Sequence, residues 1–184
     1  MVVVNPVQAQ DVSEPAIKPT PLPTNERLAA PIEIEETRYY PLNQDEVYIS
    51  TPFSADHPGI DFASKSSLIH PKISSVESGK VIFAGDTRFE ESPFGNGYGR
   101  LVVIKHDEVI SLYAHLSQID VTVGTHVSQG QETGNMGSTG NSTGTHLHFE
   151  ILTDEEGYFK KLNPMEFVGM KKITRFLVRE NGNN

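Results

Sequence analysis

Residues 145–151 read Thr-His-Leu-His-Phe-Glu-Ile and alternate between apolar and polar side chains. The apolar positions are Leu147, Phe149 and Ile151, and the polar positions are His146, His148 and Glu150. Successive side chains of a β-strand point to opposite faces, so the pattern predicts a strand that buries one face and presents two imidazoles and a carboxylate on the other. Because a strand rises about 3.4 Å per residue, these imidazoles would stand about 7 Å apart.

Similar short runs recur on the N-terminal side of this segment. Residues 80–84, 101–105 and 109–116 are rich in Val, Ile, Leu, Phe and Tyr, and turn residues separate them. These features are typical of strands. No stretch between residues 48 and 163 keeps the 3.6-residue apolar period of a helix. The sequence therefore predicts an all-β domain.

Two further segments carry histidines. In Ser-Leu-Tyr-Ala-His-Leu-Ser, residues 111–117, we expect Tyr113 and His115 on the face opposite the aliphatic residues. In His57-Pro-Gly-Ile-Asp61, the Pro-Gly pair disfavours a helix, and in extended chain positions i and i+4 share a face. The imidazole and the carboxylate can therefore converge. Taken singly, each pattern also fits a surface turn or a solvated strand face.

Taken together, these segments point to a metal. The chain has no cysteine, so any metal must be held by histidine and carboxylate. A catalytic zinc site uses three protein ligands in a tetrahedral arrangement and leaves the fourth position for water. A His/His/Asp set suits zinc where no thiolate is present. The sequence therefore indicates a zinc site on the polar face of the sheet.

The same segments carry a family resemblance. In chain order they are His57-x-x-x-Asp61, Tyr113-Ala-His115-Leu and His146-Leu-His148-Phe-Glu150. This order resembles the lysostaphin/LytM-type zinc endopeptidases of peptidoglycan, peptidase family M23, and the resemblance extends over residues 48–164. It implies an antiparallel β-sheet groove domain with barrel-sandwich-like hairpins.

The resemblance also implies roles for individual residues. One Zn2+ ion per chain would be held by His57, Asp61 and His148. His115 and His146 would form the catalytic pair beside it. Spacing leaves open which of the two is the general base, and we favour His115 with His146 assisting. The family also uses a tyrosine near the oxyanion, which no motif identifies among the six tyrosines here.

Other positions bear on the expected groove. Arg100 stands where the family often has asparagine, and we expect it at the groove rim. The Gly- and Ser-rich residues 134–144 are expected to form another part of the rim, since they lack the lysine and the following helix of a phosphate-binding loop. His70, His106 and His126 are expected at the surface or at strand ends.

The function implied by the resemblance is hydrolysis of peptide bonds in bacterial peptidoglycan cross-links, through a water activated by zinc. The alternative is a non-catalytic LytM-type domain that binds peptidoglycan or regulates a partner hydrolase. A carrier module of the biotinyl or lipoyl type is disfavoured, because its modifiable lysine should stand at a hairpin tip and Lys171 follows the matched region. The bond that is cut stays open.

The domain organisation follows from a change in composition. Residues 1–45 are rich in proline and poor in large apolar side chains, which predicts an extended, poorly ordered linker or tether. Residues 46–168 would form the M23-type domain, and residues 169–184 a basic tail. Residues 7–10, Val-Gln-Ala-Gln, are interpreted as the stub of a signal-peptide cleavage site, with the signal sequence itself missing from the chain.

Charge and hydropathy restrict the partners. The chain of 184 residues has 24 Asp and Glu against 15 Lys and Arg, a net charge of −9 that argues against nucleic acid. The sequence contains no run of about 18 apolar residues, so it predicts no membrane-spanning helix. The expected location is extracytoplasmic, secreted, wall-associated or periplasmic. Targeting is assigned to a partner or to a domain outside the chain, and a monomer is favoured.

Overall fold

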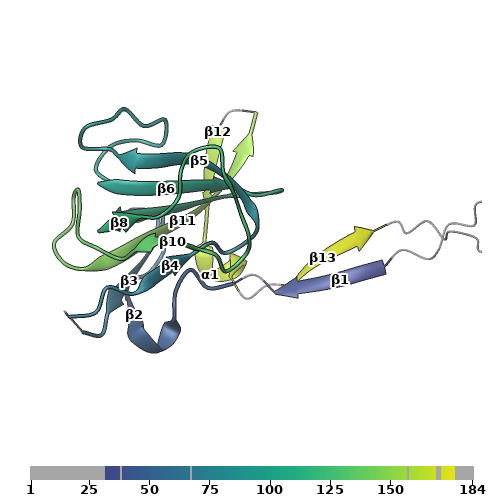
Figure 1. Cartoon of the computed structure of the whole chain (residues 1–184), viewed down its shortest axis with the longest axis horizontal. Coiled ribbons are helices and arrows are strands. Elements are labelled where there is room, and N and C mark those ends of the chain that lie inside the picture. The colour runs from purple at the N-terminus through teal and green to yellow at the C-terminus, as the bar shows by residue number, and fades with distance from the viewer. Residues whose placement is uncertain (1–31, 38, 67, 157, 169–170, 177–184) are drawn as a thin grey trace, which may run out of the picture. The chain divides into compact units, whose positions relative to one another are not determined.

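The structure, a computed structural model, describes residues 32–37, 39–66, 68–156, 158–168 and 171–176 (Figure 1). Within this part nearly every regular element is a strand, which confirms the all-β prediction. The strands are β1 (Ile32–Thr37), β2 (Val47–Thr51), β3 (Ile60–Ser64), β4 (Lys72–Ser74), β5 (Gly79–Asp86), β6 (Arg100–Lys105), β7 (Ile110–Leu116), β8 (Gln118–Ile119), β9 (His126–Val127), β10 (Glu132–Asn135), β11 (His146–Glu155), β12 (Tyr158–Leu162) and β13 (Lys171–Phe176). Two short helices complete the set, η1 (Gln44–Glu46) and α1 (Pro164–Phe167).

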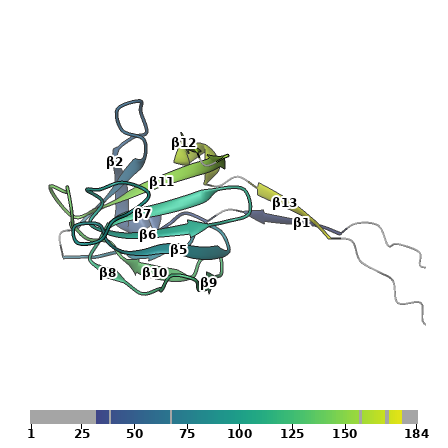
Figure 2. The same cartoon turned by 90° about the horizontal axis from the view of Figure 1, so that it is seen from above.

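Eight strands form the main sheet. Its order is β2-β3-β11-β7-β6-β5-β9, with β12 paired to the outer part of β11. The strand that carries the His-Leu-His motif thus lies between β3 and β7, and Figure 2 shows β11, β7, β6 and β5 following one another across the sheet. The pairings along this path are antiparallel. Segments that are distant in sequence therefore become direct neighbours of β11.

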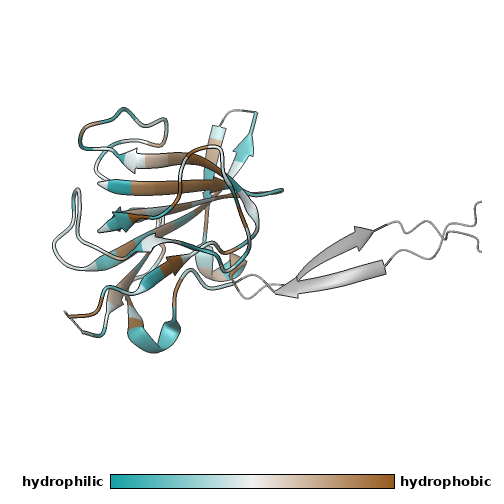
Figure 3. Cartoon of the chain, viewed as in Figure 1, coloured by the Kyte–Doolittle hydropathy of each residue, from teal (hydrophilic) through white to brown (hydrophobic). Residues whose placement is uncertain are grey.

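Apolar side chains cover both faces of this sheet. On one face, Leu147, Phe149 and Ile151 of β11 join the larger core cluster, which also takes in residues of β4 and α1 and Met136 next to β10. On the other face, a smaller cluster includes Leu101, Leu112 and Leu152. Figure 3 shows the resulting hydrophobic stretches along β5 and β6. The alternation in β11 is as predicted, with its apolar triplet on the side of the larger cluster.

A second, three-stranded sheet has the order β4-β10-β8. Ile73 of β4 and Met136 next to β10 are both fully buried in the larger core cluster. The small sheet therefore backs the face of β11 opposite His146 and His148. Burying a large apolar side chain contributes roughly 1.5–3 kcal/mol, so this packing fixes the strands that carry the polar residues.

The structure adds detail to the predicted organisation of the chain. The predicted linker, residues 1–45, lies outside the described part up to residue 31, but Leu42 is buried in the larger core cluster, ahead of the predicted boundary at residue 46. Within the predicted tail, β13 pairs with β1. The division at 1–45, 46–168 and 169–184 stays a prediction. Among the described residues, no helix has the length and apolarity needed to cross a membrane.

A chain of buried polar groups links β7 to the loop before β5. The Tyr113 hydroxyl accepts a hydrogen bond from the Val76 N–H at 3.0 Å and lies 3.0 Å from the Ser111 hydroxyl. The Ser111 hydroxyl is in turn 2.8 Å from Nε2 of His106, whose Nδ1 lies 3.0 Å from the Ser78 carbonyl oxygen. His106 directly follows β6, as expected for a strand-end residue, but it is buried. The network connects β7 and the end of β6 with the backbone of the loop before β5.

We expect the free energy of unfolding to fall as pH rises from about 10 to about 12. Burial raises the pKa of Tyr113 to about 12, against about 10 in an unfolded chain. Because the folded-state pKa is the higher one, the contribution is complete below pH 10 and is lost as pH rises through 12. Two pH units correspond to ~3 kcal/mol. Urea denaturation at several pH values should show this decline.

The matched variants are Tyr113→Phe and Tyr158→Phe. Tyr113→Phe should be less stable at neutral pH but flatter in its alkaline decline, because burial raises the pKa of two tyrosines, Tyr113 and Tyr98, and one of them is gone. Tyr158 is exposed, so Tyr158→Phe should follow the wild type throughout. An unchanged alkaline slope in Tyr113→Phe would show that another group causes the decline.

Candidate metal centre

The register of two strands brings predicted residues together. β3 and β11 are antiparallel, and Asp61 stands directly opposite His148. Cβ atoms of directly opposed residues lie about 4.5–5.5 Å apart, so the two side chains are in contact range. Nδ1 of His148 is 2.8 Å from Oδ1 of Asp61. Two residues that are 87 positions apart in the chain thus share one polar site.

The turn before β3 adds His57. Its Nδ1 lies 3.3 Å from the Pro52 carbonyl oxygen, which orients Nε2 toward the sheet, 3.2 Å from Oδ1 of Asp61. The close approach depends on Gly59. A Cβ atom at that position would lie 2.7 Å from Cε1 and 2.8 Å from Nε2 of His148, a separation that side chains do not tolerate. The glycine therefore lets the turn fold over the imidazole of His148.

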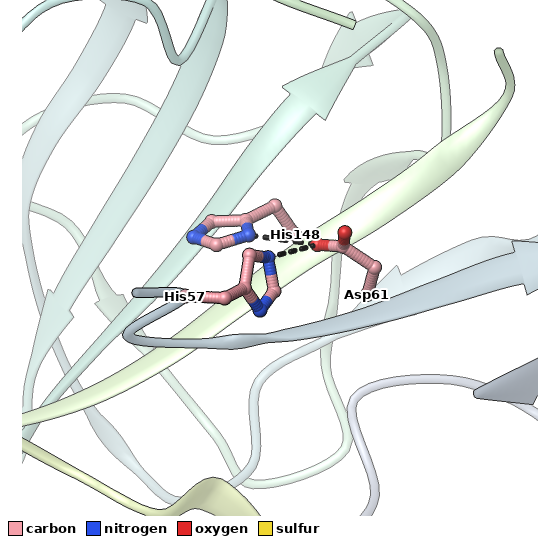
Figure 4. Close-up of side chains that lie close together, drawn as sticks. All are labelled: His57, Asp61 and His148. Atoms are coloured by element: carbon pink, nitrogen blue, oxygen red, sulfur yellow. Dashed lines mark hydrogen bonds and ion pairs between the residues drawn. The ribbon is translucent and has the colours of Figure 1, made fainter. Parts of the chain in front are cut away.

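Figure 4 shows how His57 and His148 both point at one oxygen of Asp61. One ligand atom from each of the three residues lies within 4.8 Å of the others. Zinc takes His nitrogen and carboxylate oxygen at about 2.0–2.2 Å, so tetrahedral ligand atoms stand about 3.3 Å apart. The observed separations of 2.8 and 3.2 Å are close to that spacing. The two-nitrogen, one-oxygen donor set therefore fits zinc.

His115 reaches the same site through an irregularity of its strand. Its φ is 62°, in the left-handed region that few residues other than glycine adopt. The pairing of β7 with β6 shifts register here, since Arg100 is opposite Leu116 while Val102 is opposite Tyr113. This is a β-bulge, which changes the direction in which a side chain points. Backbone strain of this kind is common at functional sites.

The bulge corrects one sequence expectation. Tyr113 and His115 do not share a face of the sheet, because Tyr113 is fully buried in the larger core cluster and His115 lies with the polar residues. Regular alternation would have buried both. The extra residue in β7 turns His115 out of the core and toward β11.

His115 and His146 lie side by side, with ring centroids 4.7 Å apart. Nδ1 of His115 is 2.8 Å from the Thr139 carbonyl oxygen, and Nδ1 of His146 is 2.8 Å from that of Gly144. A carbonyl can only accept, so Nδ1 carries the proton in both rings. The Nε2 atoms are therefore available for chemistry, and Nε2 of His146 lies 3.9 Å from Oδ1 of Asp61.

A buried carboxylate stands behind His148. Oε1 of Glu150 is 3.0 Å from Nε2 of His148 and accepts a hydrogen bond from the Tyr98 hydroxyl at 2.9 Å. Oε2 of Glu150 pairs with the ammonium of Lys161 on β12. None of these three residues had a predicted role. The alternation of β11 could have identified Glu150, whereas Tyr98 and Lys161 come from a loop and a strand with no site motif.

Burial and neighbouring charges set the pKa values of the site. Burial lowers the pKa of His115 to about 4, so its imidazole is neutral at pH 7. Burial also opposes the charged forms of Asp61 and His148, but their mutual hydrogen bond outweighs it, and the pKa falls to about 2 for Asp61. The pKa of His148 rises to about 9, with Glu150 contributing. A metal at Nδ1 of His148 would replace the proton there.

The site opens into a groove. One cavity of about 580 Å³ is lined by all five predicted residues and by Tyr98 and Asn141. A second, of about 420 Å³, is lined by Asp61, His146 and hydroxyl side chains such as Ser50 and Thr143. Asp61 and His146 border both cavities, so the two adjoin at the site. Asn141, Thr143 and Gly144 of the Gly- and Ser-rich loop also line them, which agrees with the expected rim.

Arg100 has a different position from the one expected. Its guanidinium donates a hydrogen bond to the Ser117 carbonyl at 2.6 Å and lies 4.0 Å from Asp86. It lines neither cavity of the groove. The long side chain folds back over the ends of β5 and β7, where it pairs with a backbone carbonyl and a carboxylate.

Comparison with known proteins gives a consistent picture. The model of peptidase family M23 matches residues 55–163. The murein hydrolase activator NlpD of Escherichia coli is 36% identical over 111 residues, 60% of this chain and 25% of that protein. Lysostaphin of Staphylococcus simulans is 35% identical over 113 residues, 61% of this chain and 21% of that protein. The chain thus matches about a quarter or less of the length of these relatives.

A solved structure shares the fold. A zinc-containing peptidase from Vibrio cholerae superposes with a TM-score of 0.56 and 28% identity, over 69% of this chain and 39% of that one. The described strands around the site lie within the region matched by the family model. The sheet architecture and the sequence comparisons therefore agree.

Proposed function

The chain belongs to peptidase family M23, and from this membership we propose that it is a zinc-dependent endopeptidase that hydrolyses peptide bonds in bacterial peptidoglycan cross-links. The proposal takes His57, Asp61 and His148 as zinc ligands and His115 and His146 as the catalytic pair. The observation that supports it best is that all five side chains line one cavity. A metal site with a purely structural role would not require two further imidazoles with unprotonated Nε2 atoms beside it.

The proposed mechanism divides the work between the metal and the two histidines. Zinc, when bound, would polarise a carbonyl group and lower the pKa of water to about 7. His115 is neutral at pH 7 and its Nε2 is unprotonated, so it can remove a proton from the attacking water. It can then deliver that proton to the departing amine.

His146 would stabilise charge on the substrate. In its cationic form it keeps the hydrogen bond from Nδ1 to Gly144 and gains an Nε2–H that can donate to the developing oxyanion. Nε2 of His146 lies 3.9 Å from Oδ1 of Asp61, so this atom faces the proposed metal position. His115 as the base and His146 as the oxyanion donor is the assignment that these contacts favour.

The groove suits an extended peptide. It has hydroxyl and amide side chains on its walls, including Ser50, Thr143 and Asn141, and these can pair with peptide N–H and C=O groups. We propose the cell-wall peptide as substrate, an extracytoplasmic location, and residues 46–168 as the peptidase domain. A targeting partner or domain outside the chain would offset the repulsion between an anionic wall and a net charge of −9.

A second candidate is a non-catalytic domain that activates a murein hydrolase. It is favoured by the 36% identity to an activator of that name. The retention of all five positions favours the peptidase. The two differ in a simple assay, because an activator would release no fragments from purified peptidoglycan by itself and would stimulate a separate hydrolase.

We expect a metal chelator to abolish fragment release from purified peptidoglycan and added zinc to restore it. The reason is that zinc supplies both the Lewis acid and the activated water of the proposed reaction. Mass spectrometry of the fragments would identify the bond that is cut. Fragment release that persists after complete removal of metal would contradict the zinc mechanism, and no release under any condition would favour the activator.

A further inference from the structure

The carboxylate of Glu150 is buried but fully engaged. Its side chain is 1% exposed, and an ionised carboxylate at such a place is costly unless it is paired and hydrogen-bonded. Three donors from three elements meet it, namely Nε2 of His148 on β11, the Tyr98 hydroxyl from the loop before β6, and the ammonium of Lys161 on β12. Lys161 also lies 3.3 Å from the Tyr98 hydroxyl.

This arrangement fixes the tautomer of His148. With Nε2–H donating to Glu150, Nδ1 faces Asp61 and the proposed metal position, and a metal would replace the proton on Nδ1. Carboxylates placed behind metal-bound imidazoles orient the ring and raise its basicity. The orientation of His148 therefore depends on the Glu150 carboxylate staying in place.

The strand pairing explains how Lys161 reaches the carboxylate. Lys161 is opposite Leu152, so Glu150 is its diagonal neighbour on the same face of the sheet. Lys160, the residue before it, points to the other face and pairs with Glu155 at the surface. The hairpin of β11 and β12 thus offers two adjacent lysines, of which one meets Glu150.

We propose that Lys161 and Tyr98 are positioning residues that act through Glu150 on His148 and so set the affinity of the site for zinc. This inference rests on the proposed function, since it takes His148 as a zinc ligand. Without Lys161, Oε2 of the buried carboxylate loses its partner, the carboxylate is less firmly held, and the hydrogen bond that orients His148 is weakened. Without the Tyr98 hydroxyl, Oε1 loses one of its two donors.

The test is a zinc titration against a competing chromophoric chelator, without substrate. Lys161→Met should weaken zinc binding by about 10-fold. Lys160→Met removes the same charge one residue away and should change the affinity by less than about 2-fold. Removing a lysine also removes its direct electrostatic repulsion of zinc. The Lys160→Met control measures the effect of losing one such charge, and 0.5 M salt screens this repulsion further. Lys161→Arg should recover most of the affinity.

Two further variants make the test decisive. Tyr98→Phe leaves the charge unchanged and should still weaken zinc binding several-fold. In a Glu150→Gln background, Lys161→Met should have little further effect, because both act on one chain of contacts. Wild-type affinity in both Lys161→Met and Tyr98→Phe would overturn the inference, as would a full additional loss in the Glu150→Gln background.

The outcomes separate this inference from the proposed function. If the wild type binds zinc and cleaves peptidoglycan while Lys161→Met and Tyr98→Phe bind zinc equally well, only the inference fails. If the wild type binds no zinc, the proposed function fails and the inference fails with it. If Lys161→Met does not fold, as judged by circular dichroism of the metal-free protein, Tyr98→Phe alone decides, since it removes a single oxygen atom.

Discussion

Replacing His115 with alanine is expected to lower kcat on peptidoglycan by about 10²–10⁴-fold while zinc stays bound. The imidazole is buried, neutral at pH 7 and held by the Thr139 carbonyl, so its Nε2 is available to move a proton. His115 is not one of the three residues whose ligand atoms converge. When turnover and zinc content are measured on the same sample, turnover should therefore fall while the zinc content stays at the wild-type level.

The backbone at this position calls for a second variant. His115 has a φ of 62°, a left-handed conformation that asparagine adopts at a lower conformational energy than alanine. His115→Asn should keep the β-bulge and lose turnover to a similar extent. His126 is exposed on β9, so His126→Ala is a suitable control with wild-type activity. Full activity in both His115 variants would remove this residue from the mechanism.

The fold could be predicted as far as local alternation determines it. The period-two pattern of residues 145–151 predicted a strand with its apolar side toward the core, and β11 has that arrangement. The same reasoning was wrong for Tyr113, because the face of β7 opposite Leu112 and Ala114 packs into the larger core cluster, and His115 leaves that face only through the bulge. A bulge depends on how β7 pairs with β6, and the pattern of one strand does not contain that information.

The candidate site shows a similar division. The spacing His57-x-x-x-Asp61 predicted that these two side chains converge, and Nε2 lies 3.2 Å from Oδ1. The contact between Asp61 and His148 depends on the register of β3 against β11, which the family resemblance implied and the local sequence did not. Lys161 was missed because its role arises from a diagonal contact across a hairpin. The roles of the five site residues stay predictions until they are tested.

Replacing His148 with alanine, or Asp61 with alanine, is expected to weaken zinc binding by more than about 100-fold and to abolish activity. Loss of an outer partner of a metal ligand already costs about 10–100-fold, so loss of a ligand should cost more. Asp61 has the larger effect on geometry, because both imidazoles point at its Oδ1. Metal content after dialysis and a chelator competition would measure the loss.

Thermal unfolding adds a readout that does not depend on activity. A ligand that binds only the folded state raises the melting temperature, so zinc should stabilise the wild type. The His148→Ala and Asp61→Ala variants should melt at the same temperature with and without zinc, whereas His115→Ala should keep the zinc-dependent rise. His70 lies outside the groove, with Nδ1 3.0 Å from the Met136 carbonyl oxygen, so His70→Ala should also keep it. A zinc-dependent rise of wild-type size in His148→Ala would mean that the metal is held by another set of residues.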